Sequence, residues 1–319
     1  MIRPYSLLFL GHQTFKGTLS LEDSVDCWQQ VTIALHNRLK GLEHVHYSFR
    51  DNHPGHFGFY RRLPRADAVL FWGVPQTWMR YDPRRLKRAT GCRAIITVCE
   101  RAITMNSDWR FAFCGGGTFT TRVDAPVWTG LYNHHAKRPK TVLLDHWDQD
   151  TPCDWTYQIE AWLKDLAYEF DISRYVQNES NTRALGREKS PPYVKEMRRV
   201  PFAQWLVATD RLETFVITHC ESYGYAILDM FARGTRVVCP ASFVPTHFQD
   251  KFHFDTFSTR DELIKLLRTR PNALELIRNR AGLTDWDDLV ELIDHRFQNL
   301  LNRGYRKSLS RTVGRLLER

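Results

Sequence analysis

The stretch that decides the fold is "FVITHCESYGYAILDMFARGTRVVCP", residues 215–240. Its first apolar and β-branched run ends at His219 and predicts a buried strand. A polar turn follows, and the apolar spacing over 224–233 predicts a helix that ends at Gly234, where glycine favours termination. The apolar run 235–240 predicts a second buried strand.

The turn between the first strand and the helix carries polar residues suited to ligand binding. Glu221, Ser222 and Gly224 fall at the carboxyl end of the strand, which is the edge where open parallel sheets bind ligands. Backbone N–H groups at a helix start favour a diphosphate, and carboxylates accept hydrogen bonds from sugar hydroxyls. Alternatively, Glu221 and Asp229 are ordinary acids that complement a helix dipole.

The segment "CESYGYAILDMFARGTRVVCP" resembles the "ESFG…EAMACGTPVVAP" signature of retaining GT-B glycosyltransferases of the family-four type. The signature holds two acids with seven residues between them, which are Glu221 and Asp229 here. The resemblance implies that Glu221 contacts the transferred sugar and Asp229 the ribose, although the second acid is usually Glu. It also implies an α/β GT-B fold, with two Rossmann-like doubly wound domains facing a central cleft.

The resemblance also suggests the members of the site. We expect Glu221 and His219 to be catalytic, although His219 reads equally well as a hydrogen-bonded histidine at a strand end. The donor-binding candidates are Asp229, Ser222, Tyr223, Gly224, Arg198, Pro201, Gly17 and His12. The family's usual Arg and Lys on the diphosphate are missing from "LLDHWDQDTPCDW" (143–155), so Arg198 is a candidate replacement among several basic residues.

Strand and helix patterns alternate outward from this segment and predict parallel sheets covered on both faces. We expect an N-terminal acceptor-binding Rossmann-like domain over 1–135 and a nucleotide-sugar-binding Rossmann-like domain over 141–302. The polar segment "NHHAKRPKT" (133–141) is interpreted as their linker. The resemblance implies that 303–319 forms a basic helix returning to the N-terminal domain.

The charge is unevenly distributed along the chain, whose net value is +9. Residues 1–140 hold 20 Lys and Arg against 10 Asp and Glu, and residues 141–302 hold 19 against 25. Residues 303–319 hold 6 against 1. Because the half expected to face the acceptor is basic, we predict an anionic acceptor.

The favoured acceptor is DNA carrying a hydroxymethylated pyrimidine, which would be flipped out of the duplex. The acceptor-binding candidates are Arg61, Arg62, Arg84 and Arg85, for which a solvated basic face is the plain alternative. A second hypothesis is a lipid-linked or anionic glycan, with peripheral membrane contact through the basic tail. A third is a non-catalytic GT-B-like protein that binds nucleic acid.

Composition excludes several classes of protein. No run of eighteen apolar residues predicts a membrane span, and the seven cysteines form no CxxC pair typical of zinc sites. We expect a cytoplasmic enzyme that uses a UDP- or GDP-sugar and requires no metal. The "DQD" at 148–150 leaves open a metal site of the GT-A kind, in which such acids bind Mn²⁺ on the donor diphosphate.

Overall fold

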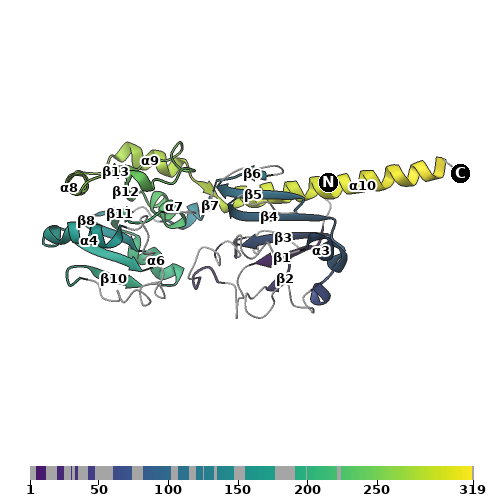
Figure 1. The fold of residues 1–319 in the computed structure, drawn as a ribbon, viewed down its shortest axis with the longest axis horizontal. Coiled ribbons are helices and arrows are strands. Elements are labelled where there is room, and N and C mark those ends of the chain that lie inside the picture. Colours follow the sequence, from purple (N-terminus) through teal and green to yellow (C-terminus); the bar gives the residue numbers. More distant parts are fainter. Residues whose placement is uncertain are drawn as a thin grey trace. The chain divides into compact units, whose positions relative to one another are not determined.

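The computed structural model describes the chain between Tyr5 and Leu317, and the structural statements below refer to its described residues. The ranges left out in between are 12–19, 25–29, 31–32, 35–41, 47–59, 74–81, 102–106, 115–119, 125, 133–134, 147–154, 177–190, 199 and 221–223. The chain forms two compact units (Figure 1). Unit 1 comprises Met1–Leu21, Asp26–Ala125 and Trp286–Arg319, and unit 2 comprises Glu22–Val25 and Pro126–Asp285.

Unit 1 is built on a six-stranded sheet in which every neighbouring pair of strands is parallel. The order is β2-β1-β3-β4-β5-β6, so the chain first extends the sheet to one side of β1 and then to the other. The strands are β1 (Leu7–Gly11), β2 (Leu42–His46), β3 (Ala68–Gly73), β4 (Ala94–Arg101), β5 (Trp109–Cys114) and β6 (Thr120–Arg122). This is the doubly wound parallel sheet predicted for the first half of the chain.

Two helical elements pack on one side of this sheet, and a long helix packs beside its centre. The short helices η1 (Tyr60–Arg62) and α3 (Pro83–Thr90) share a core with β1, β3 and β4, in which Leu86 is fully buried. The long helix α10 (Trp286–Leu317) lies along β4, and the Tyr5 hydroxyl donates to Asp294 of this helix at 2.6 Å. Among the described helices, α10 included, none is long and apolar enough to cross a membrane.

Unit 2 contains a second six-stranded parallel sheet, with the order β10-β9-β8-β11-β12-β13. Its strands are β8 (Arg138–His146), β9 (Asp171–Val176), β10 (Lys195–Arg198), β11 (Leu212–Ile217), β12 (Arg236–Pro240) and β13 (Asp255–Phe257). Its helices are α4 (Thr156–Leu163), α6 (Phe202–Thr209), α7 (Tyr225–Ala232), α8 (Arg260–Arg268) and α9 (Ala273–Ala281), with the short helices η2 (Thr129–Leu131), η3 (Lys164–Leu166) and η4 (Ala241–Phe243). A separate parallel pair joins β7 (Pro126–Val127) to β14 (Thr284–Asp285).

Helices cover both faces of the unit 2 sheet. Alternate residues of a strand point to opposite faces, and since the strands are apolar throughout, both faces must be buried. Val142 and Leu144 share a buried cluster with residues of α4 and α8. Between them in the chain, Leu143 is also buried, on the opposite face. The helix α7 packs against β12 and α9, and nearly all of its side chains are buried.

The unit boundaries lie at other positions than the predicted domain limits. The chain passes from unit 1 to unit 2 between Ala125 and Pro126, ahead of the predicted linker 133–141. The whole of α10 from Trp286 groups with unit 1, rather than only the tail 303–319. The roles assigned to the two domains remain predictions.

The predicted linker contains the beginning of β8. Arg138, Pro139 and Lys140 are exposed, and the first buried residue of the strand is Val142. The start of this strand therefore has the polar composition that is typical of a loop. The backbone nevertheless pairs, since the N–H of Arg138 donates to the carbonyl of Arg211 at 2.8 Å.

Candidate functional site

The centre of the unit 2 sheet is the place where the strand order reverses. The chain builds outward from β8 to β10 and then crosses back to place β11 on the other side of β8. Such a reversal leaves a crevice at the carboxyl ends of the two central strands, where doubly wound sheets bind ligands. The residues there are Asp145 and His146 of β8, followed by Thr218 and His219 after β11, and all four are buried.

Hydrogen bonds tie these two strand ends together. The Thr218 hydroxyl donates to the carbonyl of Asp145 and lies 2.6 Å from the hydroxyl of Thr156, which therefore donates to it. Nδ1 of His219 lies 3.2 Å from the same carbonyl. Because a carbonyl only accepts, Nδ1 carries the proton in this contact. His219 is thus a buried histidine that braces the strand ends, and its catalytic role stays a prediction.

Gly224 begins α7 in a backbone conformation that favours glycine, with φ +72°. A Cβ at this position would lie 2.6 Å from Cε2 of Phe248, so the aromatic ring packs directly on the backbone. The first-turn N–H groups of a helix carry partial positive charge, which suits a diphosphate. Glu221, Ser222 and Tyr223 immediately precede this turn and lie outside the described residues, so their roles stay predictions.

Asp229 lies inside a closed group of side chains, which we call the Asp229 cluster. Its side chain is 2% exposed, the Tyr132 hydroxyl donates to Oδ1, and Nε1 of Trp205 donates to Oδ2 at 3.0 Å. The Arg233 guanidinium lies 4.9 Å from the centre of the Tyr132 ring and donates to the carbonyl of Leu206 at 2.9 Å. The cluster, made of Tyr132, Trp205, Asp229 and Arg233, joins α7 to α6 and to the residue after η2.

Burial dominates the electrostatics of the Asp229 cluster. Desolvation raises the pKa of Asp229 to about 6, against the opposing effects of the Tyr132 hydroxyl, the Arg233 charge and the Trp205 N–H. Desolvation also lowers the pKa of the neighbouring Lys137 to about 8, and the charge of Arg233 adds to this effect. Both oxygens of the Asp229 carboxylate accept hydrogen bonds from protein side chains. The ribose contact expected of Asp229 stays a prediction.

Arg198 and Pro201 both precede α6, Arg198 as the last residue of β10 and Pro201 as the residue before the helix. The Arg198 guanidinium is exposed and donates to Glu196 at 2.9 Å. Pro201 precedes the helix, and the N–H of Phe202 in its first turn donates to the carbonyl of Ser24 at 2.7 Å. A segment from the beginning of the chain therefore caps the start of α6 beside Pro201, whose donor-binding role stays a prediction.

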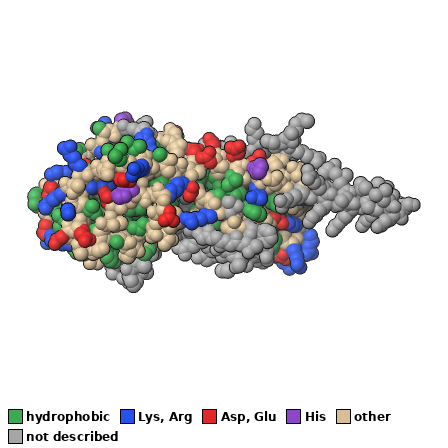
Figure 2. Space-filling model, turned by 90° about the horizontal axis from the view of Figure 1, so that it is seen from above, with side chains coloured by type: hydrophobic (Ala, Val, Ile, Leu, Met, Phe, Trp, Pro, Cys, Tyr) green, Lys and Arg blue, Asp and Glu red, His purple; other side chains and the backbone are tan. Residues whose placement is uncertain are grey.

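The four arginines predicted to bind the acceptor occupy two adjacent elements of unit 1. Arg61 and Arg62 belong to η1, while Arg84 and Arg85 belong to α3, and all four are exposed. The N–H of Asp82, the N-cap of α3, donates to the Tyr60 hydroxyl at 3.0 Å and connects the two elements. These four residues form the arginine patch, and Figure 2 shows a group of Lys and Arg side chains on this part of unit 1. His12 and Gly17 lie outside the described residues.

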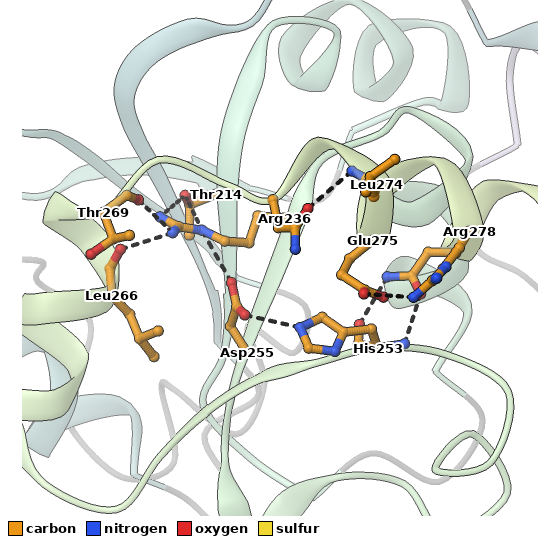
Figure 3. A network of polar contacts seen from close by, with 11 residues as sticks. Thr214, Arg236, His253, Asp255, Leu266, Thr269, Leu274, Glu275 and Arg278 are labelled. Carbon is orange, nitrogen blue, oxygen red and sulfur yellow. Dashed lines mark hydrogen bonds and ion pairs between the residues drawn. The ribbon is translucent and has the colours of Figure 1, made fainter.

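The amino edge of the unit 2 sheet is closed by a network around Arg236 (Figure 3). The buried guanidinium donates to the Thr214 hydroxyl at 3.0 Å and to the carbonyls of Leu266 and Thr269 at 2.8 Å each. Asp255 lies 3.8 Å from it. The adjacent cavity of about 10 Å³ holds no more than roughly one water molecule. The network therefore holds the strands and α8 together and leaves too little space for a nucleotide. The carboxyl edge is the candidate binding site.

A metal site is not evident in the part of the chain that the structure describes. No three His, Cys, Asp or Glu side chains among those residues are grouped so that they could hold a metal ion. The "DQD" sequence at 148–150 lies outside the described residues.

No protein-family model and no curated protein matches the chain, whereas solved structures match nearly all of it. AviGT4, a glycosyltransferase involved in avilamycin A biosynthesis, is 16% identical with a TM-score of 0.62, covering 94% of this chain and 98% of its own. The chain has a GT-B fold.

Two further GT-B structures similar to this chain contain bound nucleotide. An alpha-glucosyltransferase in complex with UDP and a 13-mer DNA containing an HMU base is 10% identical, with a TM-score of 0.56 and coverage of 93% and 99%. HepE of Anabaena, in complex with UDP and glucose, is 11% identical, with a TM-score of 0.54 and coverage of 96% and 100%. These similarities establish the GT-B architecture that the sequence predicts.

Sequence reasoning missed three residues that organise the carboxyl edge of this GT-B chain. They are Tyr132, Trp205 and Thr218, none of which belongs to a motif in the sequence. The available signal was that buried Tyr and Trp usually find a hydrogen-bond partner, which points to a polar group nearby. The sequence does not reveal that the partner is Asp229.

Proposed function

We propose that the chain is a nucleotide-sugar-dependent glycosyltransferase that retains the anomeric configuration and acts on an anionic acceptor. The observation that carries this proposal is the position of Gly224 and α7 in a GT-B fold. The helix follows the central strand β11 directly, at the point where the strand order reverses. That position combines the binding edge of a doubly wound sheet with a helix start suited to a diphosphate.

The donor we propose is a UDP- or GDP-sugar bound at the carboxyl edge of unit 2. Glu221 would hold the sugar ring and orient its anomeric carbon, and the first turn of α7 would stabilise the charge that develops on the leaving diphosphate. Arg198 is exposed near the same edge and is the proposed basic partner of the diphosphate. The scheme calls for no metal ion. Support comes from the similar GT-B structures that contain UDP.

The acceptor we propose is DNA that carries a hydroxymethylated pyrimidine. The arginine patch supplies four exposed cations in two neighbouring elements, and residues 1–140 hold 20 Lys and Arg against 10 Asp and Glu. Exposed arginines in such a patch suit phosphate contacts, which position a duplex without reading its sequence. One of the similar GT-B structures contains DNA with a modified base.

Transfer of a labelled sugar to defined acceptors tests this function. Each donor would be incubated with duplexes that differ only in one hydroxymethylated or unmodified pyrimidine, and in parallel with vesicles of anionic lipid and with an anionic polysaccharide. We expect label on the hydroxymethylated duplex alone. Label on vesicles or polysaccharide would support glycosyltransferase activity and would show that the acceptor is a lipid or a glycan instead of DNA. DNA binding without transfer from any donor would favour a non-catalytic protein.

A further inference from the structure

The Asp229 cluster connects three segments of unit 2 that are distant in sequence. Tyr132 follows η2 and is 97 residues from Asp229, while Trp205 in α6 is 24 residues from it. All three side chains are buried. A buried carboxylate that accepts hydrogen bonds from two neutral donors holds both donors in one geometry, because leaving any of these groups unpaired is costly.

The contacts join α6 and α7 at two levels. Trp205 of α6 donates to Asp229 of α7, and Arg233 just beyond the end of α7 donates to the carbonyl of Leu206. The Trp205 ring also lies 4.6 Å from the Tyr175 ring of β9, which ties the pair of helices to the sheet. The two helices are therefore fixed to one another as well as to the strands beneath them.

Both helices begin at the edge where the donor is proposed to bind. Each one follows a strand of the parallel sheet, so each one starts at the carboxyl edge. Pro201, a predicted donor-binding residue, precedes α6, and Gly224 precedes α7, on the side proposed for the diphosphate. Asp229 is five residues after Gly224, or about 7.5 Å along the helix axis. A shift of Asp229 would displace the start of α7 relative to α6.

We infer that Asp229 is a positioning residue, which fixes α7 against α6 through Trp205 and Tyr132 and so sets the spacing of the donor edge, instead of binding ribose. This inference rests on the proposed function. A ribose hydroxyl could reach the carboxylate only by displacing Tyr132 or Trp205, because the side chain is 2% exposed and each of its oxygens accepts a hydrogen bond.

The test compares the affinities of two nucleotides for a set of variants. The nucleotides are UDP and 2′,3′-dideoxy-UDP, or their guanosine counterparts if the wild type selects guanosine. The variants are Tyr132→Phe, Asp229→Ala, Asp229→Asn and the double variant Tyr132→Phe/Asp229→Ala. The control is Tyr168→Phe, which removes a phenol hydroxyl from a side chain that is 84% exposed. Affinities would be measured by titration calorimetry below the unfolding transition of each variant.

A positioning role predicts equal effects on both nucleotides. We expect Tyr132→Phe and Asp229→Ala to weaken each of them by roughly 2- to 10-fold, the equivalent of about one hydrogen bond, with the ratio between the two nucleotides as in the wild type. The double variant should bind each nucleotide no more weakly than the weaker-binding single variant does, because both substitutions remove the hydrogen bond between Tyr132 and Asp229. Asp229→Asn should recover most of the affinity, since its amide can accept from Trp205 and donate to Tyr132.

Three results would contradict these expectations in different ways. If Asp229→Ala abolishes the preference for the ribose hydroxyls while Tyr132→Phe leaves it intact, Asp229 is a ribose ligand. If both variants lower the unfolding temperature and leave both affinities unchanged, the cluster is structural only. If the wild type binds neither the uridine nor the guanosine nucleotides, the proposed function itself fails, and the inference fails with it.

Discussion

The ring of Phe248 packs so closely on Gly224 that a Cβ at this glycine would lie 2.6 Å from Cε2 of the ring. Gly234, at the other end of the same helix, has a similar backbone conformation, with φ +66° against +72°, and no atom within 4 Å of a Cβ built there. The two glycines therefore share a backbone strain on substitution, and only Gly224 adds a steric one.

Alanine substitution at the two glycines separates these effects. Gly234→Ala should lower the free energy of unfolding by about 1 kcal/mol, the cost of a left-handed conformation for an L-residue. Gly224→Ala should cost about 1–3 kcal/mol more, because the new methyl group overpacks the ring. Urea denaturation measures both values, and Phe248→Leu in the Gly224→Ala background should recover part of the loss. Equal costs at the two positions would show that the Phe248 contact is not tight.

The Arg236 network predicts a loss of stability without a loss of donor binding. Arg236→Met would remove the buried guanidinium that donates to the Thr214 hydroxyl and to the carbonyls of Leu266 and Thr269, so we expect unfolding to become easier by about 3 kcal/mol. Arg278→Met is the matched control, because that side chain is 72% exposed and should change stability by less than about 0.5 kcal/mol. Nucleotide affinity of Arg236→Met, measured where it is folded, should equal that of the wild type. A selective loss of affinity would place a binding role at the amino edge.

The raised pKa of Asp229 predicts a pH-dependent effect of replacing it. Its pKa moves from 3.8 in the unfolded chain to about 6 in the fold. In between, the folded state binds more protons than the unfolded state, so this group makes stability fall as the pH rises through that window. The cost is complete above pH 6 and amounts to about 3 kcal/mol.

Asp229→Asn removes this titration while keeping partners for Trp205 and Tyr132. We compare the free energy of unfolding of the variant with that of the wild type at each pH. The variant's advantage over the wild type should be about 2–3 kcal/mol larger at pH 7.5 than at pH 4. Urea denaturation at the two pH values measures it, with Asp261→Asn, whose side chain is 93% exposed, as the control. A stability difference that does not change with pH would mean that Asp229 keeps an ordinary pKa.

The arginine patch predicts a change in the salt dependence of DNA binding. If Arg61 and Arg62 each contact a phosphate, Arg61→Ala/Arg62→Ala should reduce the slope of log K against log salt by about 2. Fluorescence anisotropy with a labelled duplex gives this slope. The control, Arg278→Ala in unit 2, should leave it unchanged. A slope equal to that of the wild type would remove the patch from the DNA interface.

Much of the architecture could be predicted because its strands are continuous apolar runs. The apolar runs 215–219 and 235–240 matched β11 and β12, and the helix between them was placed correctly. The helix α9 was missed, since Leu274 and Ile277 on it are 66% and 63% exposed and blur its apolar period. The start of β8 was taken for a linker because its first three residues are polar or exposed.

The candidate site was harder to predict because its contacts are not local. The acid at position 229 and the glycine at position 224 are visible in the sequence, and their motif identifies the edge of the sheet. The partners of Asp229 come from elements 97 and 24 residues away, and only the tertiary packing brings them together. The same holds for Phe248, whose contact with Gly224 depends on the turn after η4.

The decisive measurement is the release of nucleoside diphosphate from UDP- and GDP-sugars by the wild type and by Glu221→Ala. We predict that the wild type turns over at least one donor in the presence of a hydroxymethylated duplex. Glu221→Ala should be at least about 100-fold slower while unfolding at a temperature near that of the wild type. Turnover by Glu221→Ala at the wild-type rate, or no turnover of any donor by the wild type, would contradict it.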